Sequence, residues 1–118
     1  LNQGFKPIMH NFNHERFMMS VHMNRYSRIC IEESIKYARQ RKTFGKRLID
    51  HQVIRHKIVN MIRKVETTHS LLENIAYMTS KGCTEKELAG IVAMAKVQSS
   101  KTMEYCAREA VQIFGGRG

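Results

Sequence analysis

Proline is almost absent from this sequence, which leaves nearly the whole chain open to helix formation. The single proline is Pro7, so residues 8–118 are free of the strongest helix breaker. No apolar run approaches the roughly 18 residues that a membrane-spanning helix needs, which argues against a transmembrane segment. The three cysteines, Cys30, Cys83 and Cys106, are odd in number and far apart. This pattern indicates reduced thiols in an intracellular protein and argues against a secreted disulfide scaffold.

Acidic residues are scarce as well. Twenty Lys and Arg stand against ten Asp and Glu, which gives a formal net charge of +10. A surplus of this size favours an anionic partner, such as nucleic acid, an acidic membrane or a phosphate-bearing cofactor, although a solvated basic surface gives the same count. The 118 residues, of which 42% are apolar and 25% charged, are sufficient for one globular domain whose core needs no disulfide or metal.

The first twelve residues lack hydrophobic periodicity. They contain Gly4 and Pro7, and we interpret residues 1–12 as an irregular lead-in. Asn13 can then cap a helix over about 14–43, which Gly45 ends. Two apolar stripes in steps of three and four follow this helix and indicate contacts on more than one side. One stripe contains Met19, Met23, Tyr26, Cys30 and Tyr37, and the other contains Phe17, Val21, Ile31, Ile35 and Ala38.

Two further helices have clear boundaries. Asp50 can cap a helix over about 51–80, which ends at Lys81 and Gly82. The segment 84–87 reads Thr-Glu-Lys-Glu, a capping box that starts a third helix over about 85–114, and Gly115 and Gly116 stop it. Each helix carries one apolar face: Ile54, Ile58, Met61, Val65, Thr68, Leu72, Ile75 and Thr79 in the second, and Leu88, Val92, Ala95, Ser99, Thr102, Cys106, Ala110 and Ile113 in the third.

These patterns predict an all-α fold, an antiparallel bundle of three long helices. Each helix has about 30 residues, and the short connections make consecutive helices antiparallel neighbours. No segment has the alternation that is typical of a strand. We expect five side chains of the second and third helices to be buried, namely Met61, Val65, Leu72, Val92 and Ala95.

The sequence predicts no metal site. His10 and His14 are four residues apart and Glu15 follows, which hints at a zinc-binding helix. The sequence contains no HExxH motif, however, and no third ligand stands at a recognisable spacing.

Two other segments suggest ligand binding. The densest basic run, residues 39–47, reads RQRKTFGKR. The negative end of a helix dipole, which attracts Lys and Arg, explains about half of this run. A nucleic-acid or nuclear-localisation patch is a second interpretation, which the length of the helices and the absence of interleaved aromatic residues argue against. A phosphate clamp in which Thr43 adds a hydroxyl is the third. The terminal run QIFGGRG, residues 112–118, is either a helix C-cap or a loop whose glycines let the backbone approach a ligand.

Taken together, these segments resemble the C-terminal helical domain of the acyl-CoA dehydrogenase family. The segment NHER, residues 13–16, resembles the start of that domain. The segment RKTFGK, residues 41–46, with His51 and Gln52, resembles the family signature RxxFGxx…Q, and residues 112–118 resemble its closing QxFGGxG. The three segments occur in the family order, and the resemblance extends over nearly the whole chain.

The resemblance implies a flavoenzyme that oxidises the α,β bond of an acyl-CoA thioester. Its FAD would extend across a subunit interface, with the diphosphate region near Arg41, Thr43 and Phe44 of the neighbouring subunit and the adenosine half near Gln52. Contacts with the same cofactor are implied for Gln112, Gly115 and Gly116. The thioester substrate would lie near Asn13, His14, Glu15 and Arg16.

The resemblance also implies a candidate for the catalytic base. Most members of the family carry this glutamate in a loop beyond the third helix, whereas a minority carry it in a Glu-Arg pair near the start of the first. Glu15 stands at that second position. The alternative role for Glu15 is to offset the positive end of the helix dipole, as acidic residues do in a first turn.

The family context completes the expectations. Residues 1–12 would follow a β domain, and residues 13–118 would be three of the four helices of the bundle, so we expect the chain alone to bind flavin poorly and to catalyse nothing. The implied partners are acyl-CoA, an electron-transfer flavoprotein or another acceptor, and further copies in a homodimer or homotetramer, with no nucleic acid. The mitochondrial matrix is favoured over the peroxisome or a bacterial cytoplasm. The alternatives are a basic helical interaction module that binds nucleic acid or acidic lipid, and a structural bundle without a ligand.

Overall fold

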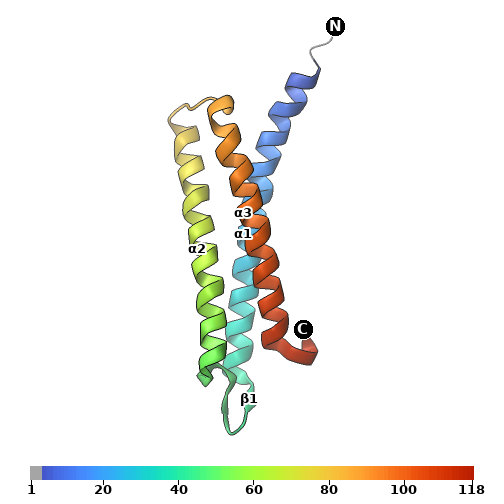
Figure 1. Ribbon diagram of the computed structural model, residues 1–118, viewed down its shortest axis with the longest axis vertical. Helices are drawn as coiled ribbons and strands as arrows, with labels where there is room; N and C mark the ends of the chain where they lie inside the picture. The colour runs from blue at the N-terminus through green and yellow to red at the C-terminus, as the bar shows by residue number, and fades with distance from the viewer. Residues whose placement is uncertain (1–3) are drawn as a thin grey trace.

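The computed structural model describes residues 4–118, with the exception of the side chains of residues 6 and 10. Three long helices run up and down side by side in a molecule of 70 × 28 × 16 Å (Figure 1). The predicted all-α antiparallel bundle is therefore confirmed. The elements in chain order are α1 (Phe5–Gln40), β1 (Lys42–Thr43), β2 (Lys46–Arg47), the 3₁₀ turn η1 (Leu48–Asp50), α2 (Gln52–Ser80), α3 (Glu85–Phe114) and the 3₁₀ turn η2 (Gly115–Arg117).

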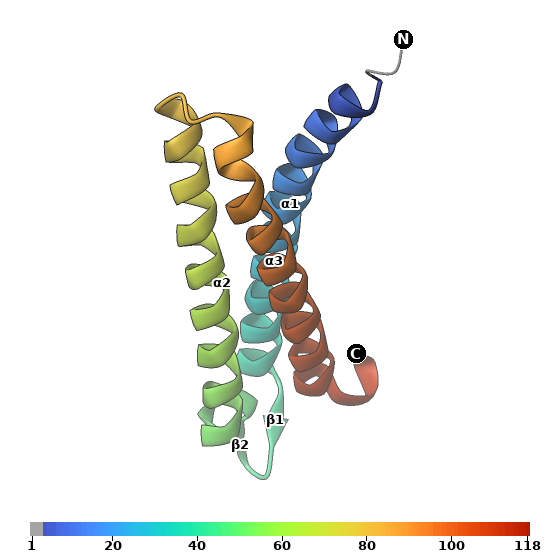
Figure 2. The same cartoon turned by 45° about the horizontal axis from the view of Figure 1, so that its top comes forward.

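Helix α1 begins earlier than the sequence pattern predicts. It starts at Phe5, with Gly4 as its N-cap residue, so the irregular lead-in is wrong for residues 5–12 and Asn13 is not the cap; residues 1–3 lie outside the described residues. Pro7 is compatible with this start because amide groups in a first turn have no partner within the helix in any case. In both ribbon views the first turns of α1 diverge from α2 and α3 (Figure 2).

A small hairpin replaces the predicted end of the first helix. Helix α1 ends at Gln40, and β1 then pairs antiparallel with β2, although no strand is predicted there. The two loop residues, Phe44 and Gly45, have φ angles of 51° and 78°. Positive φ at both positions is the geometry of the two-residue loops that match the twist of a β-hairpin. Gly45 therefore forms this turn instead of ending the helix.

Helices α2 and α3 have the predicted ends, with one exception. Thr84 and Glu87 form the expected capping box, and Gly82 and Gly115 have positive φ after the helix ends. Asp50, in contrast, does not cap α2. The N-cap residue is His51, which makes no side-chain capping bond, and the Asp50 carboxylate is held by Arg47.

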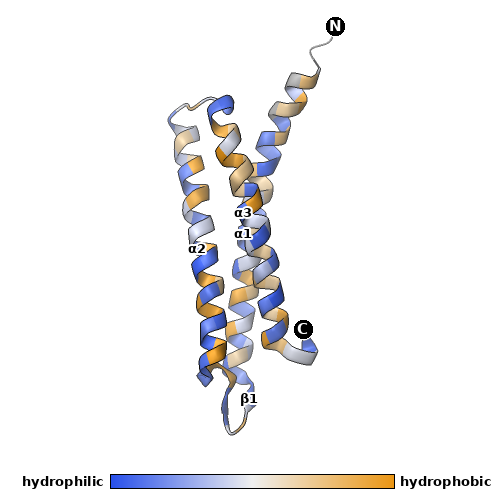
Figure 3. Cartoon of the chain, in the orientation of Figure 1, coloured by the Kyte–Doolittle hydropathy of each residue, from blue (hydrophilic) through white to orange (hydrophobic). Residues whose placement is uncertain are grey.

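The apolar faces of α2 and α3 form the core as predicted. All five expected side chains are buried, and so are all eight positions of the α3 face. The α2 face is buried from Ile54 to Ile75, whereas Thr79 is exposed. Hydrophobic and hydrophilic segments alternate along the three helices, while the two strands of the hairpin are hydrophilic (Figure 3).

The buried face of α1 differs from both predicted stripes. Ile31 and Ala38 are buried, but Met19, Val21 and Tyr26 are exposed. Small polar side chains take their place: the buried face consists of Ser20, Asn24, Ser27, Ile31, Ser34 and Ala38. Small side chains allow α1 to approach α3 closely, and each serine hydroxyl donates to the carbonyl four residues earlier, at 2.6–2.8 Å.

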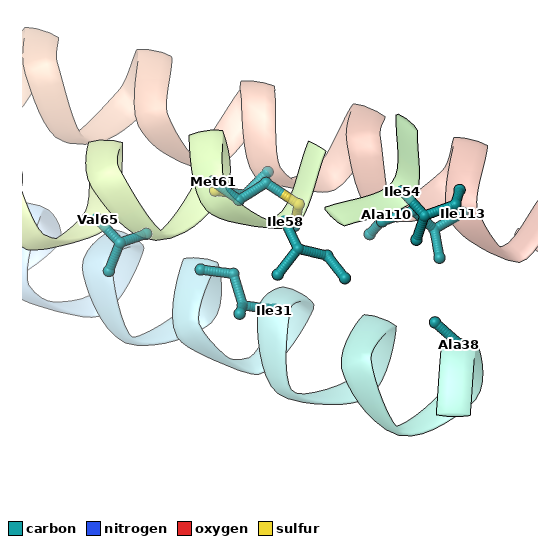
Figure 4. Packing of buried hydrophobic residues seen from close by; sticks show 9 residues of the cluster. Ile31, Ala38, Ile54, Ile58, Met61, Val65, Ala110 and Ile113 are labelled. Atoms are coloured by element: carbon teal, nitrogen blue, oxygen red, sulfur yellow. The ribbon is translucent and has the colours of Figure 1, made fainter. Parts of the chain in front are cut away.

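The core consists of two apolar clusters separated by a polar layer. The cluster at the hairpin end takes side chains from all three helices, and they point toward one another (Figure 4): Ile31, Ala38, Ile54, Ile58, Met61, Val65, Cys106, Ala110 and Ile113. The cluster at the other end contains Leu72, Ile75, Leu88, Val92 and Ala95. The polar layer between them is formed by Asn24, Ser27, Thr68, Ser99 and Thr102, all buried. The hydroxyl oxygens of Thr68 and Thr102 are 3.0 Å apart.

Candidate functional site

The hairpin presents positive charge and one aromatic ring to solvent. Arg41, Lys42, Lys46 and Arg47 are exposed, and the Phe44 ring at the tip is 98% exposed. An aromatic side chain in this position contributes nothing to the core of this chain. Together with the cations, it is suited to a ligand that combines phosphate groups with a flat apolar surface.

Arg47 differs from the other three cations because it is already paired. Its Nε and Nη2 atoms donate to the two carboxylate oxygens of Asp50, at 3.0 and 3.1 Å. This pair lowers the pKa of Asp50, mainly through the hydrogen bond from Arg47, and raises the pKa of Arg47. Within residues 4–118, no ion pair is found for Arg41, Lys42 or Lys46. These three side chains are therefore available to an anionic ligand.

The base of the hairpin is fixed to the bundle. The Leu48 amide donates to the Arg41 carbonyl at 2.8 Å, and the Thr43 hydroxyl lies 3.1 Å from Nε2 of His51. Gln52 follows at the start of α2 with an exposed side chain. The predicted residues Arg41, Thr43, Phe44 and Gln52 thus lie at the same end of the bundle.

The predicted glycine-rich segment lies at this end too. The rings of Tyr37 and Phe114, with centroids 4.6 Å apart, hold the end of α3 against the end of α1 (Figure 1). Gln112 is exposed, and a Cβ atom added at Gly115 or Gly116 would meet no heavy atom within 4 Å. The open space beside these two glycines allows close approach of a ligand to the backbone.

An apolar cavity lies at the opposite end, where α1 diverges from the other helices. Its volume is about 630 Å³, and all three helices line it, with Phe17 and Met18 from α1, Ile75 from α2, and Leu88 and Val92 from α3. Mostly apolar clefts of this size are typical of sites for small organic ligands.

Two of the four predicted substrate residues line this cavity. Asn13 and His14 contribute to its wall, whereas Glu15 and Arg16 do not. The exposed Glu15 carboxylate accepts a hydrogen bond from Nδ2 of Asn11 at 2.9 Å. Arg16 donates from Nη1 to Oδ1 of Asn13 at 3.1 Å and so contacts one of the lining residues.

Among the side chains that the structure describes, no three His, Cys, Asp or Glu residues come together as a metal-binding group. The side chain of His10, one of the residues considered above, lies outside the described residues. Over the same part of the chain, no helix is long and apolar enough to cross a membrane.

Sequence reasoning missed His51 and the role of Asp50. Asp50 reads as a helix cap, and His51 has no assigned role although it stands beside Gln52. The signal that could have revealed the hairpin is Gly45 after Phe44 within a basic run, because glycine is common at the second position of two-residue hairpin loops. The α2 and α3 residues of the cavity, such as Ile75, Leu88 and Val92, are predicted as parts of apolar faces, but no local signal shows that they line a cavity.

Comparison with known proteins agrees with this geometry. Residues 2–118 match the family model described as "Acyl-CoA dehydrogenase, C-terminal domain". The acyl-CoA dehydrogenase apdG of Emericella nidulans is 36% identical over 98% of this chain and 27% of its own length. The caffeyl-CoA reductase-Etf complex subunit CarC of Acetobacterium woodii is 34% identical over 100% of this chain and 30% of its own length. Butyryl-CoA dehydrogenase from Megasphaera elsdenii superposes with a TM-score of 0.90 at 28% identity, over 97% of this chain and 29% of that one.

The chain therefore spans less than a third of the length of the relatives that it matches. The match is continuous and confined to one domain of those proteins. Its helices, its hairpin signature and its closing glycines all fall within the matched range. By sequence and by fold, this chain belongs to the acyl-CoA dehydrogenase family, as its C-terminal helical domain.

Proposed function

We propose that the full-length protein is an FAD-dependent acyl-CoA dehydrogenase, in which this domain supplies flavin contacts across a subunit interface, part of the acyl-CoA site and contacts between copies. The observation that carries the proposal is the hairpin, which presents unpaired cations and an exposed ring on a chain of this family. When bound at these residues, FAD would supply the acceptor for the hydride that leaves the β carbon of the thioester.

The residues of the hairpin end fit the chemistry of FAD. Arg41 can hold a diphosphate through two parallel hydrogen bonds, which a lysine cannot do, and the Thr43 hydroxyl can add another. The ring of Phe44 offers an apolar surface beside these groups. Gln52, Gln112 and the open backbone at Gly115 and Gly116 are the further contacts that we propose.

The experiment compares Arg41→Ala with Lys42→Ala in the full-length protein. Both changes remove one unpaired positive charge from the same exposed segment. We expect Arg41→Ala to weaken FAD binding by about tenfold or more, because a charge-assisted hydrogen bond contributes about 1.5–3 kcal/mol. Lys42→Ala is the matched control and should have a smaller effect. Equal flavin retention by both variants on gel filtration would show that the diphosphate does not bind at Arg41.

For the substrate, we propose that Asn13, His14, Glu15 and Arg16 lie near the thioester and that the apolar cavity beside Asn13 and His14 belongs to the acyl-CoA site. We further propose that the Glu15 carboxylate takes the proton from the α carbon. The start of α1 at Phe5 supports this role, because it removes the alternative that Glu15 offsets the positive end of the helix dipole. Glu15 lies about three turns into the helix, and the dipole of a helix acts on charges only within the first turn.

The test of the base is Glu15→Gln in the full-length enzyme, with Glu33→Gln as the control on the exposed surface of the same helix. FAD should stay bound to both variants. Its reduction by acyl-CoA should fall about 10²–10⁴-fold in Glu15→Gln alone. Near-normal reduction in Glu15→Gln would place the base outside this domain.

We propose three further properties of the full-length protein. Its electron acceptor is an electron-transfer flavoprotein, which is consistent with the Etf complex of the relative CarC. It forms a homodimer or homotetramer, which sedimentation velocity would measure. It works inside the cell, which agrees with three cysteines that are all free thiols.

A further inference from the structure

We propose that His51 is a positioning residue: through the hydroxyl of Thr43, it holds the hairpin in the conformation that presents Arg41 and Phe44 to the flavin. This inference rests on the proposed function of the hairpin. It assigns a role to a side chain that makes no capping hydrogen bond, although His51 is the N-cap residue of α2, and that belongs to neither core cluster.

His51 is a rigid anchor because its own backbone is fixed on both sides. Its amide donates to the Leu48 carbonyl at 3.2 Å. Its carbonyl accepts from the amides of Ile54 and Arg55, at 3.1 and 3.2 Å, which are the first bonds of α2. The half-buried imidazole therefore extends from the end of a 29-residue helix toward the hairpin.

The imidazole of His51 contacts the hairpin at Thr43, the residue that precedes the turn. Nε2 of His51 lies 3.1 Å from the Thr43 hydroxyl, and the imidazole ring is edge-on to the Phe44 ring, with centroids 6.4 Å apart and planes at 77°. A hydroxyl both donates and accepts. When Nε2 donates to it, the Thr43 hydrogen remains free to donate to a phosphate oxygen, so one contact can fix the hairpin and orient the hydroxyl.

The turn needs such an anchor because its conformation is strained. Phe44 has a φ of 51°, a region that costs about 1–2 kcal/mol for a residue other than glycine. Its ring is almost fully exposed, so burial does not offset that cost. The Arg47–Asp50 pair holds the β2 side of the hairpin. Among the described residues, the bond to His51 is the side-chain restraint on the β1 side.

The experiment uses the full-length protein and four variants: His51→Ala, His51→Gln, Thr43→Val, and the double variant that combines His51→Ala with Thr43→Val. Apo-protein is titrated with FAD, and hydrogen exchange of the amides of residues 42–47 is measured on the same samples. We expect His51→Ala to weaken FAD binding about five- to tenfold, the value of one hydrogen bond, and to speed exchange in the hairpin. His51→Gln, whose amide can reach the same hydroxyl, should restore most of both. The double variant should be no weaker than Thr43→Val, because His51 acts through that hydroxyl.

Three results would overturn the inference. Unchanged FAD affinity and exchange in His51→Ala, with loss of flavin in Arg41→Ala, would refute the role of His51 and leave the proposed function intact. Additive losses in the double variant would show that His51 acts independently of Thr43. Retention of flavin by Arg41→Ala would refute the hairpin as a flavin contact, and the inference would fall with it. If His51→Ala does not fold, His51→Leu takes its place, because leucine fills the half-buried position without a hydrogen-bond donor. It should lose flavin where His51→Gln does not, and equal FAD affinity of these two variants would refute the inference.

Discussion

The buried amide of Asn24 leads to a prediction that runs against the usual effect of core substitutions. Asn24 lies in the polar layer, is 5% exposed, and its Oδ1 atom has no hydrogen-bond partner within the described residues. A buried oxygen without a partner costs about 1–3 kcal/mol. Leucine has a similar shape and no polar atom, so Asn24→Leu should increase the free energy of unfolding by about that amount.

Helix propensity adds a smaller contribution that a control removes. Leucine is a better helix former than asparagine by a few tenths of a kcal/mol. Asn60→Leu makes the same change at an exposed position of α2. The difference between the two variants isolates the effect of the buried oxygen. At an m-value of about 1–3 kcal/mol/M, it corresponds to a shift of about 1 M in the urea midpoint.

The assay is equilibrium urea unfolding of the 118-residue chain, followed by far-ultraviolet circular dichroism at equal protein concentrations. We expect a higher midpoint for Asn24→Leu than for Asn60→Leu. A lower midpoint, or equal gains in the two variants, would show that Oδ1 has a partner in solution, such as a bridging water, and would refute the reasoning.

Three other predictions concern single side chains. Met61→Ala should lower the free energy of unfolding by about 2–5 kcal/mol in urea unfolding, because Met61 is fully buried, whereas Met94→Ala, at a 62% exposed position, should change it by less than about 0.5 kcal/mol. Burial, and secondarily the nearby Cys30, raises the pKa of Cys106 from 9.0 to about 11. Alkylation of this thiol should therefore be slow until urea unfolds the chain. The free energy of unfolding should fall as pH rises from 9.0 toward 11, because the thiol ionises first in the unfolded chain. Because the pKa of Asp50 is lowered from 3.8, the Arg47–Asp50 pair should still be present at pH 3.8 and be lost only at lower pH. NMR titration of the Asp50 carboxyl group should give a midpoint below 3.8, and Arg47→Ala should raise that midpoint.

Long apolar faces and strong caps made α2 and α3 predictable. Ile54 to Ile75 recur in steps of three and four, and Thr84 with Glu87 marks a helix start by local hydrogen bonds alone. The buried face of α1 was not predictable in this way. Its serines are buried because α1 and α3 approach closely, although hydropathy ranks Ser20 below its exposed neighbours Met19 and Val21. Which face of a helix is covered by a neighbour is a tertiary property.

The candidate site divides in the same way. Arg41, Thr43 and Phe44 were found together because they are adjacent in the sequence, and the hairpin keeps them so. The two-residue strands are too short to show alternation, so Gly45 read as a helix end and His51 received no role. The cavity required the angle between α1 and its neighbours, which depends on packing along the whole bundle.

The polar layer has a consequence for how the domain opens. Buried hydroxyl and amide groups, with the Met23 and Met103 sulfur atoms that accept from serine hydroxyls, separate the two apolar clusters along the bundle. We therefore expect the clusters to open as separate cooperative units on the same three helices. The end with the cavity should then fluctuate without loosening the cluster at the hairpin end. We expect the hairpin, which adjoins that cluster through Leu48, to keep its geometry while the opposite end of the same helices opens.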